Sequence, residues 1–202
     1  AAAARELGIE PGRVLVSSTG VIGVPLPVDR IERGIVGMAA ELQDDPLVGA
    51  QGIMTTDTHP KALSASVGDA TITWVAKGSG MIEPNMATML AYIFTDARLD
   101  APALDRLLRA AADRSFNMLS VDGDTSTSDT CAILANGHAG PVDEDAFAEV
   151  LLAGCVRMTE TLARDGEGAT RLLRVNVRGA RDDADARAVA KSLVNSPLVK
   201  TM

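Results

Sequence analysis

The sequence predicts an α/β fold built from layered sheets, and three features of its 202 residues support this class. Strand-like and helix-like segments alternate, and the helices come between strands or strand pairs rather than after every strand. Hydrophobic residues make up 47% of the chain, which is enough to form a core at this length. Only 2% of the residues are aromatic, so we expect that core to consist of Ala, Val, Leu and Ile.

Five elements are expected in the first part of the chain. Residues 13–18 have an apolar centre at 14–16 and lead into a glycine-containing turn, as is typical of a short strand. A helix is expected at 29–42, because an aspartate can cap it and large hydrophobic side chains recur at helical spacing. Residues 52–56 suggest another strand, and the runs at 62–67 and 70–76 predict a hairpin.

The rest of the chain again alternates between strands and helices. An aspartate can cap each of the first two helices, and the last strand is predicted from alternating hydrophobic and polar residues. These elements are a strand from Thr88, a helix from Asp100, a strand at 130–134, a helix at 143–163, a strand at 172–177 and a helix at 183–194.

Composition restricts the classes of function. The formal net charge of −8 argues against a nucleic-acid partner, which normally requires a basic surface. No apolar run approaches the roughly 18 residues of a membrane span, and no secretory segment is visible, so we expect a cytoplasmic protein with no membrane partner. Cys131 and Cys155 lack metal-ligand spacing and are expected to be buried thiols, and no metal site is predicted. Because the chain opens without an initiator methionine and ends in an apolar run, we expect it to be part of a longer chain.

The run at 77–95 contains the main candidate for catalysis. Two glycines and a proline precede Thr88, which begins an apolar strand-like segment. A strained bond between Ala87 and Thr88 would allow the threonine hydroxyl to attack the preceding carbonyl, and hydrolysis of the ester would expose an α-amine. This amine titrates at about 8 and can accept the hydroxyl proton. A threonine that begins a strand is also explained by packing alone, so both interpretations stay open.

Other residues are weaker candidates. Backbone N–H of Gly20 and the hydroxyl of Thr19 could stabilise a tetrahedral oxyanion, although a plain strand-to-loop transition explains them equally well. Lys77 could hold a substrate carboxylate and Glu167 a substrate ammonium, whereas the alternative for each is a solvated charge. The hydroxyl-rich run at 55–61 is typical of turns and caps.

Six ordered segments, spread over nearly the whole chain, carry a family resemblance. They are SSTGVIGVPLP (17–27), MTTDTHPK (54–61), KGSGMIEPNMATML (77–90), SVDGDTSTSDT (120–130), GEGATR (166–171) and SPLVKTM (196–202). In this order around an Ala-Thr junction, they resemble the ornithine acetyltransferase family, which includes glutamate N-acetyltransferases and bifunctional arginine-biosynthesis proteins. The resemblance implies an α-β-β-α sandwich similar to that of N-terminal-nucleophile hydrolases.

The resemblance also implies self-cleavage between Ala87 and Thr88. Residues 1–87 would then be the C-terminal part of an α chain and residues 88–202 the N-terminal part of a β chain, because the family continues on both sides of this sequence. The two chains are expected to form a heterotetramer or a larger assembly.

The implied reaction is a ping-pong transfer in arginine biosynthesis. N-acetylornithine would acetylate the threonine, ornithine would leave, and glutamate would take the acetyl group. No cofactor is required, although some family members also use acetyl-CoA as donor. The resemblance assigns the oxyanion hole to Thr19 and Gly20 and the substrate site to Thr55, Lys77, Thr88 and Glu167.

Two alternative functions remain open at this point. The same Thr88 chemistry, with water as acceptor, would make the protein an amidohydrolase or aminopeptidase. A fold that does not cleave itself would instead be a non-catalytic binding or assembly module.

Overall fold

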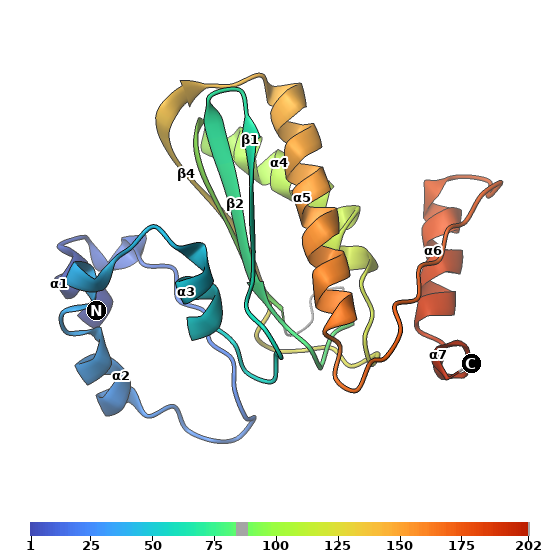
Figure 1. The fold of residues 1–202 in the computed structure, drawn as a ribbon, viewed down its shortest axis with the longest axis horizontal. Coiled ribbons are helices and arrows are strands. Elements are labelled where there is room, and N and C mark those ends of the chain that lie inside the picture. Colours follow the sequence, from blue (N-terminus) through green and yellow to red (C-terminus); the bar gives the residue numbers. More distant parts are fainter. Residues whose placement is uncertain (84–88, 202) are drawn as a thin grey trace. The chain divides into compact units, whose positions relative to one another are not determined.

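A computed structural model describes residues 1–83 and 89–201 and divides into two compact units. The first unit is Ala1–Asp45 and the second is Pro46–Met202 (Figure 1). Ala87 and Thr88 lie outside the described residues, so the expected junction between α and β chains is identified from the sequence alone.

The first unit contains two short helices and two 3-10 turns. Helix α1 (Ala2–Leu7) contacts α2 (Val28–Ile35), and the N–H of Gly37 donates a hydrogen bond of 2.8 Å to Oε1 of Glu6. The helix expected to reach residue 42 ends at Ile35, because Val36 takes an extended conformation with a φ of −64° and a ψ of 124°, and Gly37 then begins a 3-10 turn with a φ of 84°. The predicted strand at 13–18 is wrong, because 14–20 have no regular structure and pair with no strand in the part of the chain described.

A four-stranded sheet is the centre of the second unit. Its strands are β1 (Lys61–Val67), β2 (Ala70–Lys77), β3 (Leu90–Arg98) and β4 (Thr130–Pro141), in that spatial order. The first three strands are antiparallel and β4 runs parallel to β3. The hairpin is confirmed, with Gly68 at a φ of 57° in its turn, where a residue without Cβ is favoured.

Two helices cover one face of this sheet (Figure 1). Helix α4 (Ala101–Asp113) links β3 to the parallel strand β4, and α5 (Glu144–Arg164) packs along β1 and β2. Both predicted caps are confirmed: Asp100 accepts from the N–H of Ala103, and Asp143 from the N–H of Ala146, each at 2.8 Å. This sheet with its helix layer confirms the α/β class.

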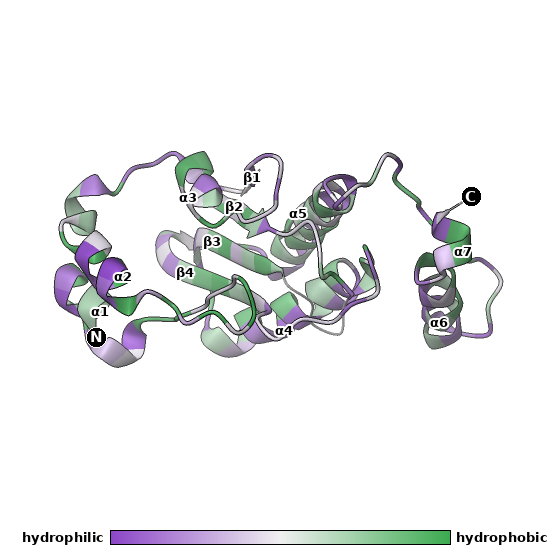
Figure 2. Ribbon diagram, turned by 90° about the horizontal axis from the view of Figure 1, so that it is seen from below, coloured by the Kyte–Doolittle hydropathy of each residue, from purple (hydrophilic) through white to green (hydrophobic). Residues whose placement is uncertain are grey.

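The core lies between the sheet and these helices, and the strands β3 and β4 are predominantly hydrophobic (Figure 2). Alternate strand residues such as Ile72, Ala76 and Ile93 face the helices and are buried. The expectation of a purely aliphatic core is only partly right, because three aromatic residues are also buried in it. They are Trp74, Phe116 and Phe147.

The remaining predictions divide between confirmed and wrong. Helix α6 (Asp183–Val194) has the predicted bounds, and α7 (Pro197–Lys200) follows it. The strand expected at 52–56 is wrong, because α3 (Pro46–Gly52) ends there in turns. The prediction of a strand at 172–177 is also wrong, because these residues pair with none of the four strands of the sheet. An alternating sequence forms a strand only where a partner strand takes up its backbone hydrogen bonds. None of the helices in the described residues is both long and apolar enough to cross a membrane.

Candidate functional site

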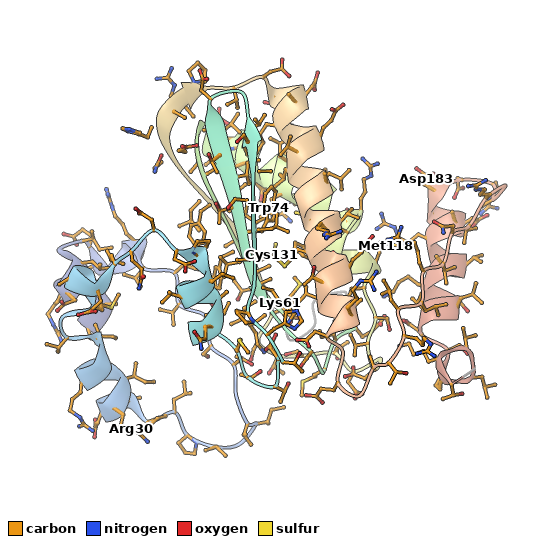
Figure 3. All side chains as sticks on the ribbon, viewed as in Figure 1. Arg30, Lys61, Trp74, Met118, Cys131 and Asp183 are labelled. Atoms are coloured by element: carbon orange, nitrogen blue, oxygen red, sulfur yellow. The ribbon has the colours of Figure 1, made fainter. Side chains whose placement is uncertain are left out.

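Three segments that carry predicted site residues meet at one end of the sheet. Lys77 is the last residue of β2, and Lys61, the first residue of β1, lies opposite Ala76 in the register. Figure 3 shows Lys61 at this end, near the C-terminal end of α5, where the segment with Glu167 begins. Residues 55–60 lead directly into β1. The topology therefore places the Thr55, Lys77 and Glu167 segments next to one another.

Lys77 is a buried ammonium, with only 2% of its surface exposed. Burial lowers the pKa of Lys77, and the nearby carboxylate of Asp57 partly opposes this effect. Asp129 and Glu167 also face it with negative charge, whereas Lys61 adds positive charge. A buried cation with a lowered pKa and several charged neighbours is typical of a functional site.

Glu167 lies against the loop that follows Lys77. Its N–H donates a hydrogen bond of 2.7 Å to the carbonyl oxygen of Ser79. Its carboxyl group occupies the space beside Gly80, since a Cβ at Gly80 would lie 2.6 Å from Cδ of Glu167. The lack of a side chain at residue 80 therefore allows this position of the carboxylate.

The Thr55 segment is tied to the same loop by Asp57. Oδ1 of Asp57 accepts from the N–H of Gly78 at 2.6 Å, directly after Lys77, and Oδ2 accepts from the N–H of Thr55 at 3.1 Å. The hydroxyl groups of Thr56 and Ser79 are also hydrogen-bonded at 2.7 Å. Thr55 itself is exposed, whereas Asp57 is buried.

A buried ionic cluster supports this arrangement, and sequence reasoning missed it. Nζ of Lys61 lies 2.7 Å from Oδ1 of Asp57 and 2.5 Å from Oδ2 of Asp165, with both carboxylates and the ammonium at most 3% exposed. Asp165 also accepts from the N–H of Thr58 at 3.0 Å and from its hydroxyl group. The hydroxyl-rich 55–61 run is typical of turns and caps, and a lysine at the start of a strand gives no signal in the sequence that it is buried.

Burial and hydrogen bonding oppose each other at the two carboxylates of the cluster. Burial would raise the pKa of Asp57, but hydrogen bonds from Lys61, Gly78 and Thr55 outweigh it and lower that pKa. The pKa of Asp165 is lowered in the same way, by Lys61 and Thr58 against the effect of burial. Both groups are therefore ionised partners of the Lys61 ammonium.

The segment at 120–129 holds the described residues on both sides of 84–88. Before them, Asp122 accepts from the N–H groups of Met81 at 2.5 Å and Ile82 at 3.0 Å. After them, Oδ1 of Asp129 accepts from the N–H of Met89 at 2.8 Å. Oδ2 of Asp129 is buried with no hydrogen-bond partner among the described residues, and burial raises the pKa of this carboxyl group. Met81 has a φ of 55°, which is uncommon for a residue with a side chain.

Thr19 and Gly20 belong to the first unit, in an irregular loop between the 3-10 turn Pro11–Arg13 and α2. Gly20 has a φ of 153°, and a Cβ there would meet nothing within 4 Å. The two units are each defined by themselves, so the assignment of these residues to an oxyanion hole stays a prediction from the sequence.

The cysteines take no part in this site. Cys155 is buried and Cys131 half-buried, and both are free thiols. Burial raises the pKa of Cys131 to about 12 and that of Cys155 to about 11, so neither is a ready nucleophile. Among residues 1–83 and 89–201, no group of three or more His, Cys, Asp or Glu side chains is placed to hold a metal ion.

Known proteins resemble this chain along its whole length. It is 49% identical over 202 residues to the "Arginine biosynthesis bifunctional protein ArgJ" of Rhodococcoides fascians, a match that covers 100% of this chain and 50% of that protein. It is 50% identical over 203 residues to the "Glutamate N-acetyltransferase Oat2" of Streptomyces clavuligerus, covering 99% of this chain and 51% of the relative. The chain therefore spans about half the length of the curated relatives it matches.

A solved structure and a family description agree with these relatives. The crystal structure of the arginine biosynthesis bifunctional protein ArgJ from Bacillus halodurans superposes with a TM-score of 0.54 at 41% sequence identity, over 56% of each chain. The family model of the ArgJ family matches residues 1–202 of this chain. With that match over its full length, this chain belongs to the ArgJ family.

Proposed function

We propose that the protein carrying this chain is a glutamate N-acetyltransferase of arginine biosynthesis, which moves an acetyl group from N-acetylornithine to glutamate. The observation that carries this proposal is the 50% identity, over nearly the whole chain, to a relative named glutamate N-acetyltransferase. The meeting of the Thr55, Lys77 and Glu167 segments at one end of the sheet supports it, because these residues were assigned to one substrate site.

Self-cleavage between Ala87 and Thr88 would generate the nucleophile. The hydroxyl of Thr88 attacks the carbonyl carbon of Ala87, and the peptide bond breaks to give an ester and the free α-amine of Thr88. Water then hydrolyses the ester, which releases the carboxylate of Ala87 and restores the Thr88 hydroxyl. Asp122 and Asp129 accept hydrogen bonds from Ile82 and Met89, and so connect the 120–129 segment to described residues on both sides of this bond. The α chain, through Ala87, and the β chain, from Thr88, then assemble in the cytoplasm as a heterotetramer or a larger complex.

Acetyl transfer follows on the free Thr88. Its hydroxyl attacks the acetyl carbonyl of N-acetylornithine while the α-amine takes the proton, and Thr19 and Gly20 stabilise the oxyanion. The intermediate collapses, ornithine leaves with a proton on its amine, and the acetyl group stays as an ester on Thr88. The amine of glutamate then attacks this ester and releases N-acetylglutamate. No cofactor takes part, and acetyl-CoA is an alternative donor for the same ester.

Two charged residues would position the substrates. The buried ammonium of Lys77 pairs with the substrate carboxylate, and the carboxylate of Glu167 pairs with the side-chain ammonium of ornithine. The placement of both residues beside the loop 78–80 supports this division of roles.

Dependence on glutamate tests the proposed function. The purified protein is expected to release ornithine from N-acetylornithine at a sustained rate only when glutamate is present, because the ester on Thr88 must be discharged by an amine. Ornithine and N-acetylglutamate are measured by chromatography with and without glutamate. Release at an equal rate without glutamate would instead identify an amidohydrolase.

The position of Glu167 can be tested at Gly80. Gly80→Ala is expected to lower kcat/KM about tenfold, which is about 1.4 kcal/mol, by displacing the Glu167 carboxylate. Because the contact is with the far end of a flexible side chain, the unfolding temperature should change little. In a Glu167→Gln background, Gly80→Ala should have a smaller effect, since the two changes act on one interaction. Equal effects in both backgrounds would show that Gly80 acts in another way.

A further inference from the structure

The three segments that carry Thr55, Lys77 and Glu167 are connected to one buried cation, Lys61, by hydrogen bonds and short stretches of chain. Asp57, its first partner, accepts from the N–H groups of Thr55 and Gly78, and Gly78 directly follows Lys77. Asp165, its second partner, lies two residues before Glu167. This ionic cluster of Asp57, Lys61 and Asp165 is the only described ion-pair network between charged groups that are all at most 3% exposed.

We propose that Lys61, Asp57 and Asp165 are positioning residues, which fix the Thr55, Lys77 and Glu167 segments in their substrate-binding arrangement. The proposal rests on the proposed function for the identity of the substrate. Lys61 donates hydrogen bonds to both carboxylates. Asp57 in turn binds backbone N–H groups of the Thr55 and Lys77 segments, and Asp165 binds the N–H of Thr58 and lies next to the Glu167 segment.

The first connection runs through Asp57. Its two oxygens receive three donors at 3.1 Å or less: Nζ of Lys61, the N–H of Gly78 and the N–H of Thr55. One carboxylate therefore sets the distance between the loop that carries Thr55 and the end of the strand that carries Lys77. Without its charge, the hydrogen bonds weaken, because bonds to ionised acceptors are roughly twice as strong as neutral ones.

The second connection runs through Asp165. Nζ of Lys61 and the N–H of Thr58 hold its Oδ2, so the end of α5 is attached to the Thr55 loop. Two residues later, the N–H of Glu167 is bonded to Ser79 O in the loop that follows Lys77. These bonds form a closed circuit from the 55–58 loop to the 165–167 segment and back through the 77–79 loop.

Charge balance also connects the cluster to Lys77. Two carboxylates and one ammonium leave the cluster with one net negative charge, next to the buried positive charge of Lys77. Stability alone does not require such a cluster, because a well-packed hydrophobic replacement of a buried ion pair is often neutral or stabilising. The hydrogen bonds that connect this cluster to the 55–58, 77–79 and 165–167 segments therefore support a positioning role.

Asp57→Asn is the principal test, in the intact protein. The amide retains one acceptor oxygen but loses the charge, so KM for N-acetylornithine is expected to rise, and binding measured by calorimetry to weaken, each about tenfold. The effect on kcat should be smaller. Asp165→Asn serves as a second variant if the first does not fold, and we expect the same direction of change.

Asp96 provides a matched control for Asp57, because its carboxylate also accepts a hydrogen bond from a backbone N–H but lies far along the chain from the cluster. Oδ1 of Asp96 on β3 accepts from the N–H of Thr71 at 2.7 Å, at the opposite end of β2. Asp96→Asn is expected to leave KM and calorimetric affinity within about twofold of the unaltered protein.

A double-mutant cycle separates positioning from a general loss of structure. If Asp165 acts through Glu167, Asp165→Asn should raise KM less in a Glu167→Gln background than in the unaltered protein. Unchanged KM and affinity in both Asp57→Asn and Asp165→Asn, or additive effects in the cycle, would overturn the positioning role. Failure of the unaltered protein to transfer acetyl groups would contradict the proposed function instead, and the calorimetric affinities would still decide the role of the cluster.

Discussion

Thr88→Ala is expected to leave the chain uncut at residue 87 and to abolish acetyl transfer. The substitution removes the hydroxyl group that would attack both the Ala87 carbonyl and the acetyl donor. On a denaturing gel the unaltered protein should run as two bands, whereas the variant should run as one. N-terminal sequencing of the second band should begin Thr-Met-Leu, the residues that follow the junction.

Conservative and distant substitutions make this result specific. Thr88→Ser keeps a hydroxyl group and should retain cleavage and part of the transfer rate. Thr71→Ala changes an exposed threonine at the start of β2, at the other end of this strand from Lys77, and should leave both unaffected. An uncut chain that still transfers acetyl groups would contradict self-activation. An uncut chain that forms no acetyl ester with N-acetylornithine would favour a non-catalytic module.

Gly154→Ala is expected to destabilise the second unit by about 1–3 kcal/mol, the usual cost of overpacking a core. A Cβ at Gly154 would lie 2.2 Å from Cζ2 of Trp74, whose ring is 1% exposed between the sheet and α5 (Figure 3). A buried ring cannot turn away as an exposed side chain can, so the helix or the ring must shift. Chemical denaturation, followed by the fluorescence of the single tryptophan, measures the free energy of unfolding.

Gly49 provides the control, because it is also a helical glycine. A Cβ there would meet nothing within 4 Å, so Gly49→Ala in α3 should stabilise the protein by up to about 1 kcal/mol. The two substitutions are chemically identical and should have opposite signs. Stabilisation by Gly154→Ala would show that the ring does not occupy the space above this glycine.

Local sequence signals predicted the elements whose interactions are close in the chain. Asp100 and Asp143 each cap a helix three residues before the N–H they bind, and the hairpin pairs Val67 with Ala70. The strand predicted at 172–177 has equally clean alternation, yet it is not a strand. Alternating hydrophobic and polar residues show only which side chains favour burial. A strand also needs a neighbouring strand that forms hydrogen bonds with its backbone N–H and C=O groups.

The candidate site shows the same division. Lys77 and Glu167 could be assigned to the substrate site from the sequence because the segments that contain them resemble those of the family, although each charge alone is equally explained by solvation. Asp57, Lys61 and Asp165 could not, because the two aspartates are 108 positions apart and only the packing of α5 on β1 brings them to one lysine. Only the structure explains why residue 80 is a glycine, because the carboxylate of Glu167 occupies the space that a side chain would need.

By itself, the sequence determined the α/β class, the capped helices and the hairpin, and it placed an adjacent Ala87 and Thr88 within six ordered segments that resemble a family. These depend on side-chain chemistry and short-range spacing, which a linear sequence records directly. Only the tertiary structure decided which strands form, which charges are buried, and how Lys61 connects the Thr55, Lys77 and Glu167 segments. Burial and pairing are properties of contacts between distant residues, and such contacts exist only once the sheet and α5 have packed together.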